Sequence, residues 1–154
     1  MHILLVEDEE PKQRHIEGYL RVALVEPHIV FAMSVRGALD QLAIAVPDVL
    51  ILDMSLPTFD IGGTEGGGRP QGFGGLEVIR NMELEEYSCP VIFITGYEAF
   101  NKAGGQLTLD ALADELLADH PDLFRGIIHY NSAYGDWQSR LKMLIDGIQG
   151  IVNK

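Results

Sequence analysis

The chain has 154 residues, 47% of them apolar, and its 23 acidic and 11 basic side chains give a formal net charge of -12. This length supports one compact domain with a hydrophobic core and is too short for two comfortable ones. A field of that sign would repel nucleic-acid phosphates and anionic lipid, so we expect no direct nucleic-acid ligand and no membrane binding.

The cysteine content and the N-terminal sequence indicate the cellular compartment of the protein. Cys89 is the only cysteine, so it cannot form an internal disulfide, and we expect it to be a buried structural thiol. The N-terminal sequence MHILLVEDEE has an apolar run far too short for a secretory signal or a membrane span. We therefore expect a soluble cytoplasmic protein.

Short apolar runs alternate with longer amphipathic stretches along the chain, which predicts an α/β fold with crossover helices. The expected strands are residues 2–6, 28–33, 48–53, 90–95 and 126–130. The expected helices cover residues 9–26, 35–44, 76–86, 107–120 and a last segment from about residue 136. The third strand is apolar without alternation, as in a central parallel strand covered on both faces. We therefore predict a doubly wound five-stranded parallel sheet in a single domain over residues 1–154.

Local signals mark two helix starts and one long interruption. Asp8 is placed to cap the first helix, and Ser34 the second. Residues 58–75 contain eight glycines in eighteen positions, which predicts a loop insertion that is mobile in the free protein. Its last residues, GFGG, precede a helix and could cradle phosphate, but a flexible surface loop is favoured because no Walker-type lysine accompanies them.

Polar side chains follow the expected strands where each strand ends. Glu7 and Asp8 come after the first strand, Asp53 ends the third and Thr95 ends the fourth. Because ligands of open parallel sheets bind at the carboxyl ends of the strands, these side chains should gather at one edge. Crowded carboxylates repel one another unless a cation lies among them, and oxygen ligands with open positions favour Mg²⁺. The pattern predicts a magnesium site suited to phosphoryl transfer.

The stretches ILLVEDE, DVLILDMSLP and PVIFITG resemble, in order and spacing, the receiver domain of bacterial two-component response regulators. The resemblance covers essentially the whole chain and implies the flavodoxin-like receiver fold. It also implies that Asp53 is the phosphoacceptor and that Thr95 hydrogen-bonds the phosphoryl group. Glu7 and Asp8 would then hold Mg²⁺ together with Asp53 and the backbone carbonyl of Ser55.

The same resemblance implies a signalling role. A sensor histidine kinase or a phosphotransfer protein would phosphorylate the chain, and a downstream protein partner would read the result. We expect a stand-alone receiver, since no residues remain after the last helix to build an output domain. We expect no enzymatic activity beyond magnesium-dependent self-phosphorylation and self-dephosphorylation.

The sequence departs from the receiver pattern at the end of the fifth strand. Receivers normally carry a lysine there, whereas GIIHYNSAY offers His129 or Tyr130, depending on the register. His129 is most simply a strand residue. The bases that could replace the lysine are Lys102, Arg125 and Arg69, none of which the sequence places. Without this cation phosphorylation could be weak, or uncoupled from conformational change.

Other interpretations of the same residues stay open. Glu7 and Asp8 could favour the positive end of the following helix, and Asp53 could satisfy loop amides. Thr95 could be an ordinary β-branched strand residue. The rival function is a pseudo-receiver, a protein interaction module that does not depend on phosphorylation. A magnesium-dependent phosphatase would need an acid two residues after the nucleophile, where Ser55 stands instead.

Overall fold

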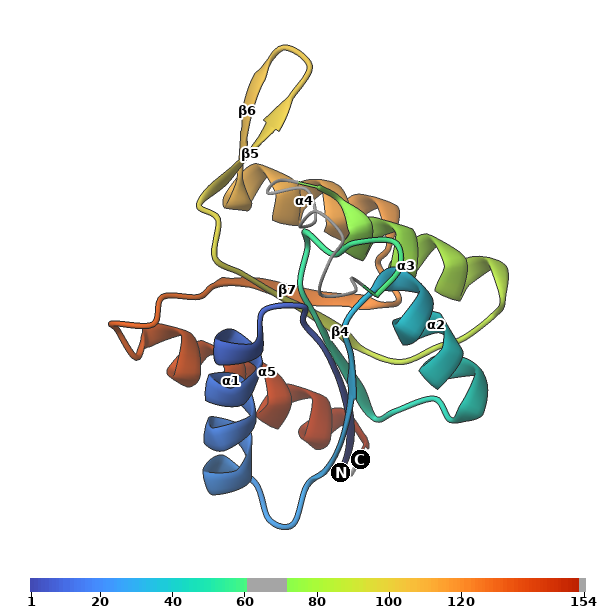
Figure 1. Ribbon diagram of the computed structural model, residues 1–154, viewed down its shortest axis with the longest axis vertical. Coiled ribbons are helices and arrows are strands. Elements are labelled where there is room, and N and C mark those ends of the chain that lie inside the picture. Colours follow the sequence, from blue (N-terminus) through green and yellow to red (C-terminus); the bar gives the residue numbers. More distant parts are fainter. Residues whose placement is uncertain (61–71, 153–154) are drawn as a thin grey trace.

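The computed structural model describes residues 1–60 and 72–152, and it contains the predicted five-stranded parallel sheet (Figure 1). In spatial order the strands are β2 (His28–Ala32), β1 (His2–Val6), β3 (Val49–Leu52), β4 (Val91–Thr95) and β7 (Phe124–His129). The α/β doubly wound prediction is confirmed. All four residues of β3 are buried, as expected for a central strand covered on both faces.

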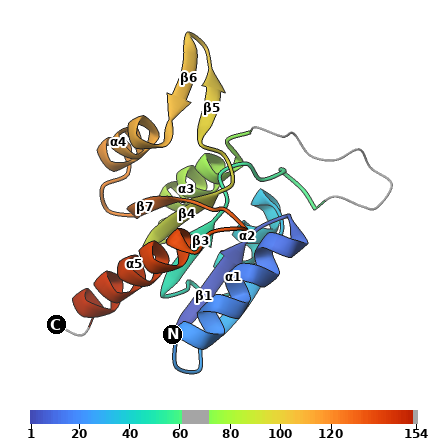
Figure 2. The same ribbon diagram turned by 90° about the vertical axis from the view of Figure 1, so that its left-hand side faces the viewer.

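Helices cover both faces of the sheet (Figure 2). One face carries α2 (Val35–Ile44), α3 (Gly74–Leu84) and α4 (Leu109–Asp119), and the other carries α1 (Glu10–Ala23) and α5 (Asp136–Val152). Each strand contributes alternate side chains to the two cores: in β1, Leu4 and Val6 join one cluster, whereas Ile3 and Leu5 join the other. No helix in the described part of the chain is long and apolar enough to cross a bilayer.

The strand register brings the carboxyl ends of the strands to one edge. Val6 lies opposite Leu52, and Asp53 donates its backbone N–H to the Val6 carbonyl at 3.0 Å. Thr95 at the end of β4 lies opposite His129 at the end of β7. The residues that follow these strands therefore leave the sheet at the same level.

The segment between β4 and α4, where no strand was predicted, has regular structure. It forms an antiparallel hairpin of β5 (Ala99–Lys102) and β6 (Gly105–Thr108), which projects from the body of the protein (Figures 1 and 2). Gly104 and Gly105 have φ angles of 97° and 135°, a backbone conformation that suits glycine and allows the tight turn. Helix α4 consequently starts two residues later than predicted, with the Thr108 side chain accepting a hydrogen bond from the Ala111 N–H.

The two predicted helix caps have different outcomes. Ser34 caps α2, because its Oγ accepts a hydrogen bond from the Gly37 N–H at 2.9 Å. The prediction that Asp8 caps α1 is wrong: Glu9 occupies the N-cap position and makes no capping hydrogen bond with its side chain. The Asp8 carboxylate instead lies close to those of Glu7 and Asp53, as described below.

Two glycines fit α3 tightly under the end of β3. The helix begins at Gly74, two residues earlier than predicted. A Cβ at Gly74 would lie 2.2 Å from the Leu56 carbonyl oxygen, and one at Gly75 would lie 2.7 Å from the Asp53 carbonyl oxygen. The Gly75 N–H donates to the Met54 carbonyl at 2.8 Å, so it is not free for phosphate. Most of the predicted mobile loop over 58–75 lies outside the described residues, and its mobility stays a prediction.

Candidate functional site

Three acids meet where β1 and β3 end. Glu7 is 1% exposed, Asp53 is 4% exposed, and Asp8 is partly buried between them. One carboxylate oxygen from each lies within 4.8 Å of the others. The structure therefore brings together the three acids that the sequence analysis assigned to this edge. We refer to Glu7, Asp8 and Asp53 as the acid cluster.

Backbone hydrogen bonds that continue beyond the strands hold the acid cluster in place. The Glu7 N–H donates to the Ala32 carbonyl at 3.0 Å, and the Asp53 N–H donates to the Val6 carbonyl at the same distance. The Glu7 side chain is also fixed, because its Oε1 accepts the Glu9 N–H at 3.0 Å. These bonds leave one oxygen of Glu7 and one of Asp53 pointing into the cluster.

A lysine that the sequence analysis missed lies against these acids. Lys12, in the first turn of α1, is 5% exposed. Its Nζ lies 2.6 Å from Glu7 Oε2 and 3.3 Å from Asp53 Oδ1, and it donates a hydrogen bond to the Ile94 carbonyl at 3.0 Å. A signal was present in the sequence: Lys12 lies four and eight residues before Ile16 and Leu20, on the buried stripe of the helix.

Burial and mutual repulsion shape the charges of the site. Burial raises the pKa of Glu7 to about 8; Lys12 opposes this rise, and Asp53 adds to it. Burial and the Asp53 charge also raise the pKa of Asp8. For Lys12, burial alone would lower the pKa, but the charges of Asp53 and Glu7 outweigh it and the pKa is raised. The site thus contains three carboxyl groups and one ammonium, and this excess of negative charge favours the binding of a further cation.

The donor set fits a hard divalent cation. Glu7 Oε2 and Asp53 Oδ1 are buried and accept no well-directed hydrogen bond from the described residues, although both form ion pairs with Lys12. Carboxylate oxygens at such spacing are ligands that Mg²⁺ prefers, with its remaining positions filled by water or phosphate. Ser55 lies next to the cluster, with its hydroxyl 3.5 Å from Asp53 Oδ2. The role of its backbone carbonyl stays a prediction.

Asp53 of the acid cluster lines a pocket of about 550 Å³. The pocket is lined by residues from the ends of three strands, β3, β4 and β7, and from the start of α1, namely Glu9, Lys12, Asp53, Ser55, Gly96, Tyr97, Glu98, His129, Tyr130, Asn131 and Ser132. Polar groups dominate its wall around one buried carboxylate. Such a pocket suits a charged, transferable group better than an apolar ligand.

A family model named response regulator receiver domain matches residues 3–118. The chain belongs to this family. Among its relatives is the Detocs response regulatory protein DtcB of Enterobacter cloacae, 24% identical over 143 residues that cover 92% of this chain and 95% of that protein.

Solved receiver structures share the fold. A receiver domain protein from Clostridium thermocellum matches with a TM-score of 0.65 at 18% identity, over 99% of this chain and 96% of that one. The response regulator TrrA of Thermotoga maritima, in complex with Mg²⁺ and BeF, matches with a TM-score of 0.58 at 18% identity, over 93% and 97% of the two chains. Receiver domains bind Mg²⁺ at an acidic pocket, and this receiver has such a cluster of acids.

Thr95 of this receiver is buried at the end of β4. The side chain is fully buried, and its Oγ1 accepts a hydrogen bond from the Tyr97 N–H at 3.2 Å. Gly96 and Tyr97 line the pocket, but Thr95 is not among the described residues that do so. Its role stays a prediction.

The end of β7 resolves the register of the missing lysine. His129 is the last residue of the strand, and Tyr130 follows, with its N–H donating to the Thr95 carbonyl at 2.7 Å. The Tyr130 ring centroid lies 5.7 Å from Lys12 Nζ, and its hydroxyl lies 2.7 Å from His15 Nδ1. Tyr130 thus packs against the lysine that α1 supplies.

Of the three bases named from the sequence, the structure describes only the side chain of Arg125, and it lies away from the acid cluster. Arg125 lies near the amino end of β7, at the opposite end of the strand, and donates to the Phe124 carbonyl at 3.1 Å. Arg69 and the Lys102 side chain lie outside what the structure describes. Arg125 is therefore not the replacement for the missing lysine, because it lies at the amino end of β7 whereas the acid cluster lies at the carboxyl ends of the strands.

Proposed function

We propose that this receiver is a phosphorylation-switched signalling module in which Asp53 accepts a phosphoryl group from a sensor histidine kinase or a phosphotransfer protein. The observation that carries the proposal is a buried but pocket-facing Asp53 within a cluster of three acids and one lysine. Output would pass to a downstream protein partner. The name of the relative DtcB, a response regulatory protein, agrees with a regulatory role.

The proposed transfer is a displacement at phosphorus. A carboxylate oxygen of Asp53 attacks the phosphorus of a phosphohistidine, so that an O–P bond forms while the N–P bond breaks. The electron pair of the broken bond stays on the imidazole nitrogen, which takes up a proton, and Asp53 becomes an acyl phosphate. Bound Mg²⁺, held by Glu7, Asp8 and Asp53, would neutralise charge on the transferring oxygens. The hydrogen bond from the Asp53 N–H to the Val6 carbonyl fixes the backbone of the attacking residue, which lines the pocket.

A second candidate is the pseudo-receiver, which binds partners without phosphorylation. Two observations favour it: neither position 129 nor position 130 carries a lysine, and Thr95 is buried, with its hydroxyl bound to the Tyr97 N–H. The intact acid cluster favours the first candidate. In either case we propose that the chain is not an enzyme, apart from magnesium-dependent self-phosphorylation and self-dephosphorylation.

The two candidates separate in one experiment. The wild-type protein is incubated with a small phosphodonor and Mg²⁺, and its intact mass is measured beside that of Asp53→Asn. A phosphorylation switch gains the mass of one phosphoryl group, which hydroxylamine removes as expected for an acyl phosphate, and Asp53→Asn gains none. If the wild type shows no gain, or if Asp53→Asn gains equally, the acceptor role is rejected.

A further inference from the structure

Burial of the Lys12 ammonium is unfavourable in free energy unless partners stabilise its charge. The residue lies on the same face of α1 as Ile16 and Leu20, both fully buried, and its own side chain is 5% exposed. Removing an ammonium from water is unfavourable, and an apolar side chain of similar length could fill the same place. The contacts of Nζ with charged and polar groups therefore explain why this buried position holds a lysine.

Those contacts join the ends of three strands. Nζ pairs with Glu7 after β1 and Asp53 after β3, and donates to the Ile94 carbonyl in β4. An ammonium has three donors, and each of these three groups offers an oxygen. Nζ is thus held beside Asp53 Oδ1 before any reaction takes place. No other described cation forms an ion pair with Asp53.

We propose that Lys12, on α1, is the cation that pairs with the phosphoryl group on Asp53 in this receiver, in place of the lysine that is missing at the end of β7. The inference rests on the proposed function, since it assigns a contact of the same acceptor. A phosphoryl group carries about -1.5 to -2 charge and three acceptor oxygens. Nζ lies 3.3 Å from the oxygen of Asp53 and lines the pocket, so it can exchange carboxylate contacts for phosphoryl contacts.

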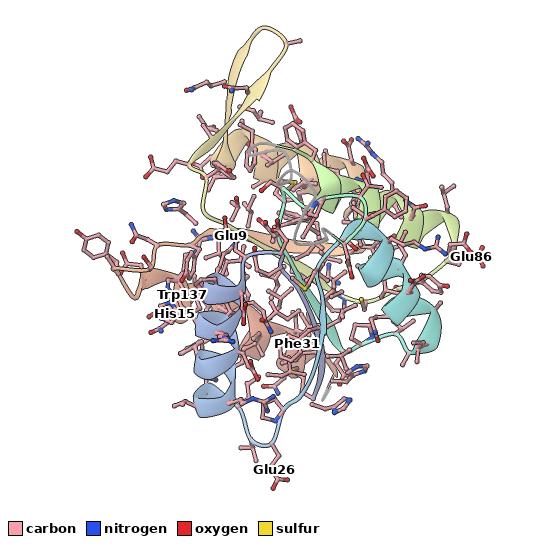
Figure 3. The ribbon with its side chains drawn as sticks, viewed as in Figure 1. Glu9, His15, Glu26, Phe31, Glu86 and Trp137 are labelled. Atoms are coloured by element: carbon pink, nitrogen blue, oxygen red, sulfur yellow. The ribbon has the colours of Figure 1, made fainter. Side chains whose placement is uncertain are left out.

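The surroundings of Lys12 connect it to the aromatic side chains between α1 and α5. Tyr130 packs over Nζ and contacts His15. Trp137 lies against both rings, with centroids 5.3 Å from Tyr130 and 5.1 Å from His15, and Figure 3 shows His15 and Trp137 side by side. A change in the position of Lys12 should therefore alter the environment of Trp137. It is the only tryptophan of the chain, which provides a fluorescence signal.

The test uses Lys12→Met, which keeps the length of the side chain and removes its charge, beside Lys12→Arg. Lys142→Met is the matched control, since Lys142 lies on α5 and pairs with Asp146. Mg²⁺ with beryllium fluoride, a phosphoryl mimic, is titrated while Trp137 fluorescence is followed, and phosphorylation is measured by intact mass. Circular dichroism in Mg²⁺ confirms that each variant is folded.

We expect Lys12→Met to bind the mimic about tenfold or more weakly, as for the loss of a charge-assisted hydrogen bond, and to lose the Trp137 response. Lys12→Arg should recover part of both, and Lys142→Met should match the wild type. Equal binding and an equal Trp137 response in Lys12→Met would overturn the inference. Because the mimic needs no transfer, a wild type that binds it in a Lys12-dependent way but gains no mass would reject the proposed function and leave the Lys12 contact standing. A wild type that does not bind the mimic would reject the Lys12 contact.

Discussion

Lys12 and Glu7 form a buried ion pair at 2.6 Å, shorter than the 3.3 Å contact between Lys12 and Asp53. The lysine thus lies against the acid cluster and offsets repulsion among its carboxylates. Glu7 and Lys12 lie five positions apart in the sequence, across the turn from β1 into α1.

Removing the ammonium should make stability depend on magnesium. In Lys12→Met, the carboxylates of Glu7 and Asp53 lose their common partner, and breaking a buried pair costs about 3 kcal/mol in the free energy of unfolding. Added Mg²⁺ should restore most of this loss, because it binds the folded acid cluster. Thermal unfolding with Mg²⁺ and with a chelator measures the effect. An Lys12→Met protein as stable as the wild type in chelator would show that the pair does not stabilise the fold.

Magnesium binding should depend on the acid cluster. Asp8→Ala and Asp53→Ala should each lower the affinity for Mg²⁺ strongly, since each removes a carboxylate ligand and negative charge. Asp114→Ala, an exposed acid on α4, serves as the control for net charge and should change little. Isothermal titration calorimetry gives the affinities. Unchanged binding in both cluster variants would mean that the carboxylates are structural.

A lysine placed at the end of β7 should strengthen the response to phosphorylation. Tyr130 contacts Lys12, so Tyr130→Lys brings a second cation to the pocket, and His129→Lys tests the neighbouring wall position. Added contact energy in the phosphorylated state shifts the conformational equilibrium further. Amide exchange near Thr95, with and without phosphodonor, measures the coupling. If neither variant nor the wild type gains mass, the chain behaves as a pseudo-receiver.

Small residues under Asp53 should be required for its position. In Gly75→Ala the new Cβ would meet the Asp53 carbonyl oxygen at 2.7 Å and the Phe93 ring at 2.8 Å, so we expect a loss of about 1–3 kcal/mol and weaker Mg²⁺ binding. Gly147→Ala on α5 is the control. Its Cβ would meet nothing within 4 Å, and stability should rise by about 0.5–1 kcal/mol. Equal stability of the two variants in chemical denaturation would contradict the expected close packing.

The thiol of Cys89 should resist modification in the native protein. Burial, with a smaller contribution from Asp48, raises its pKa to about 12, so at pH 8 the nucleophilic thiolate is scarce. Iodoacetamide should label it only after denaturation. The pKa of Cys89 in the folded protein lies above the ordinary value of 9.0, so the unfolded chain loses the thiol proton first as the pH rises. The stability that the buried neutral thiol contributes is therefore fully present below pH 9 and is lost as the pH rises toward 12. Cys89→Ala should lack that alkaline loss, and rapid native labelling would show that the thiol is accessible.

The strands and the acid cluster could be predicted because their signals are local. An apolar run such as residues 49–52 has few alternatives in an α/β chain, and an acid that ends such a run must lie at the carboxyl edge of the sheet. The β5–β6 hairpin could not be predicted in this way. Its strands have only four residues each, which is too short for a clear pattern. The ring of Phe100 in β5 also contacts the rings of Phe73 and Tyr97, which lie outside the hairpin.

Lys12 was missed for a different reason. A charged residue in an amphipathic helix is assigned to solvent by default, because buried lysines are rare. Its spacing from Ile16 and Leu20 placed it on the buried face, but the partner that makes this position tolerable, Asp53, lies forty-one residues further along the chain. Only the folded structure shows that Lys12 contacts both Glu7 and Asp53.

The location of Lys12 also changes which part of the chain determines the electrostatics of the pocket. Residues 7–12 carry the lysine and two of the three acids, so a single β1–α1 unit contains most of the ionic framework around Asp53. The end of β7 therefore does not need to supply a positive charge to the pocket. Tyr130 instead offers a hydroxyl and a ring that join α1 to α5. A chimaera that transfers residues 1–23 into another receiver would carry the ammonium with it and leave the recipient's own β7 end unchanged.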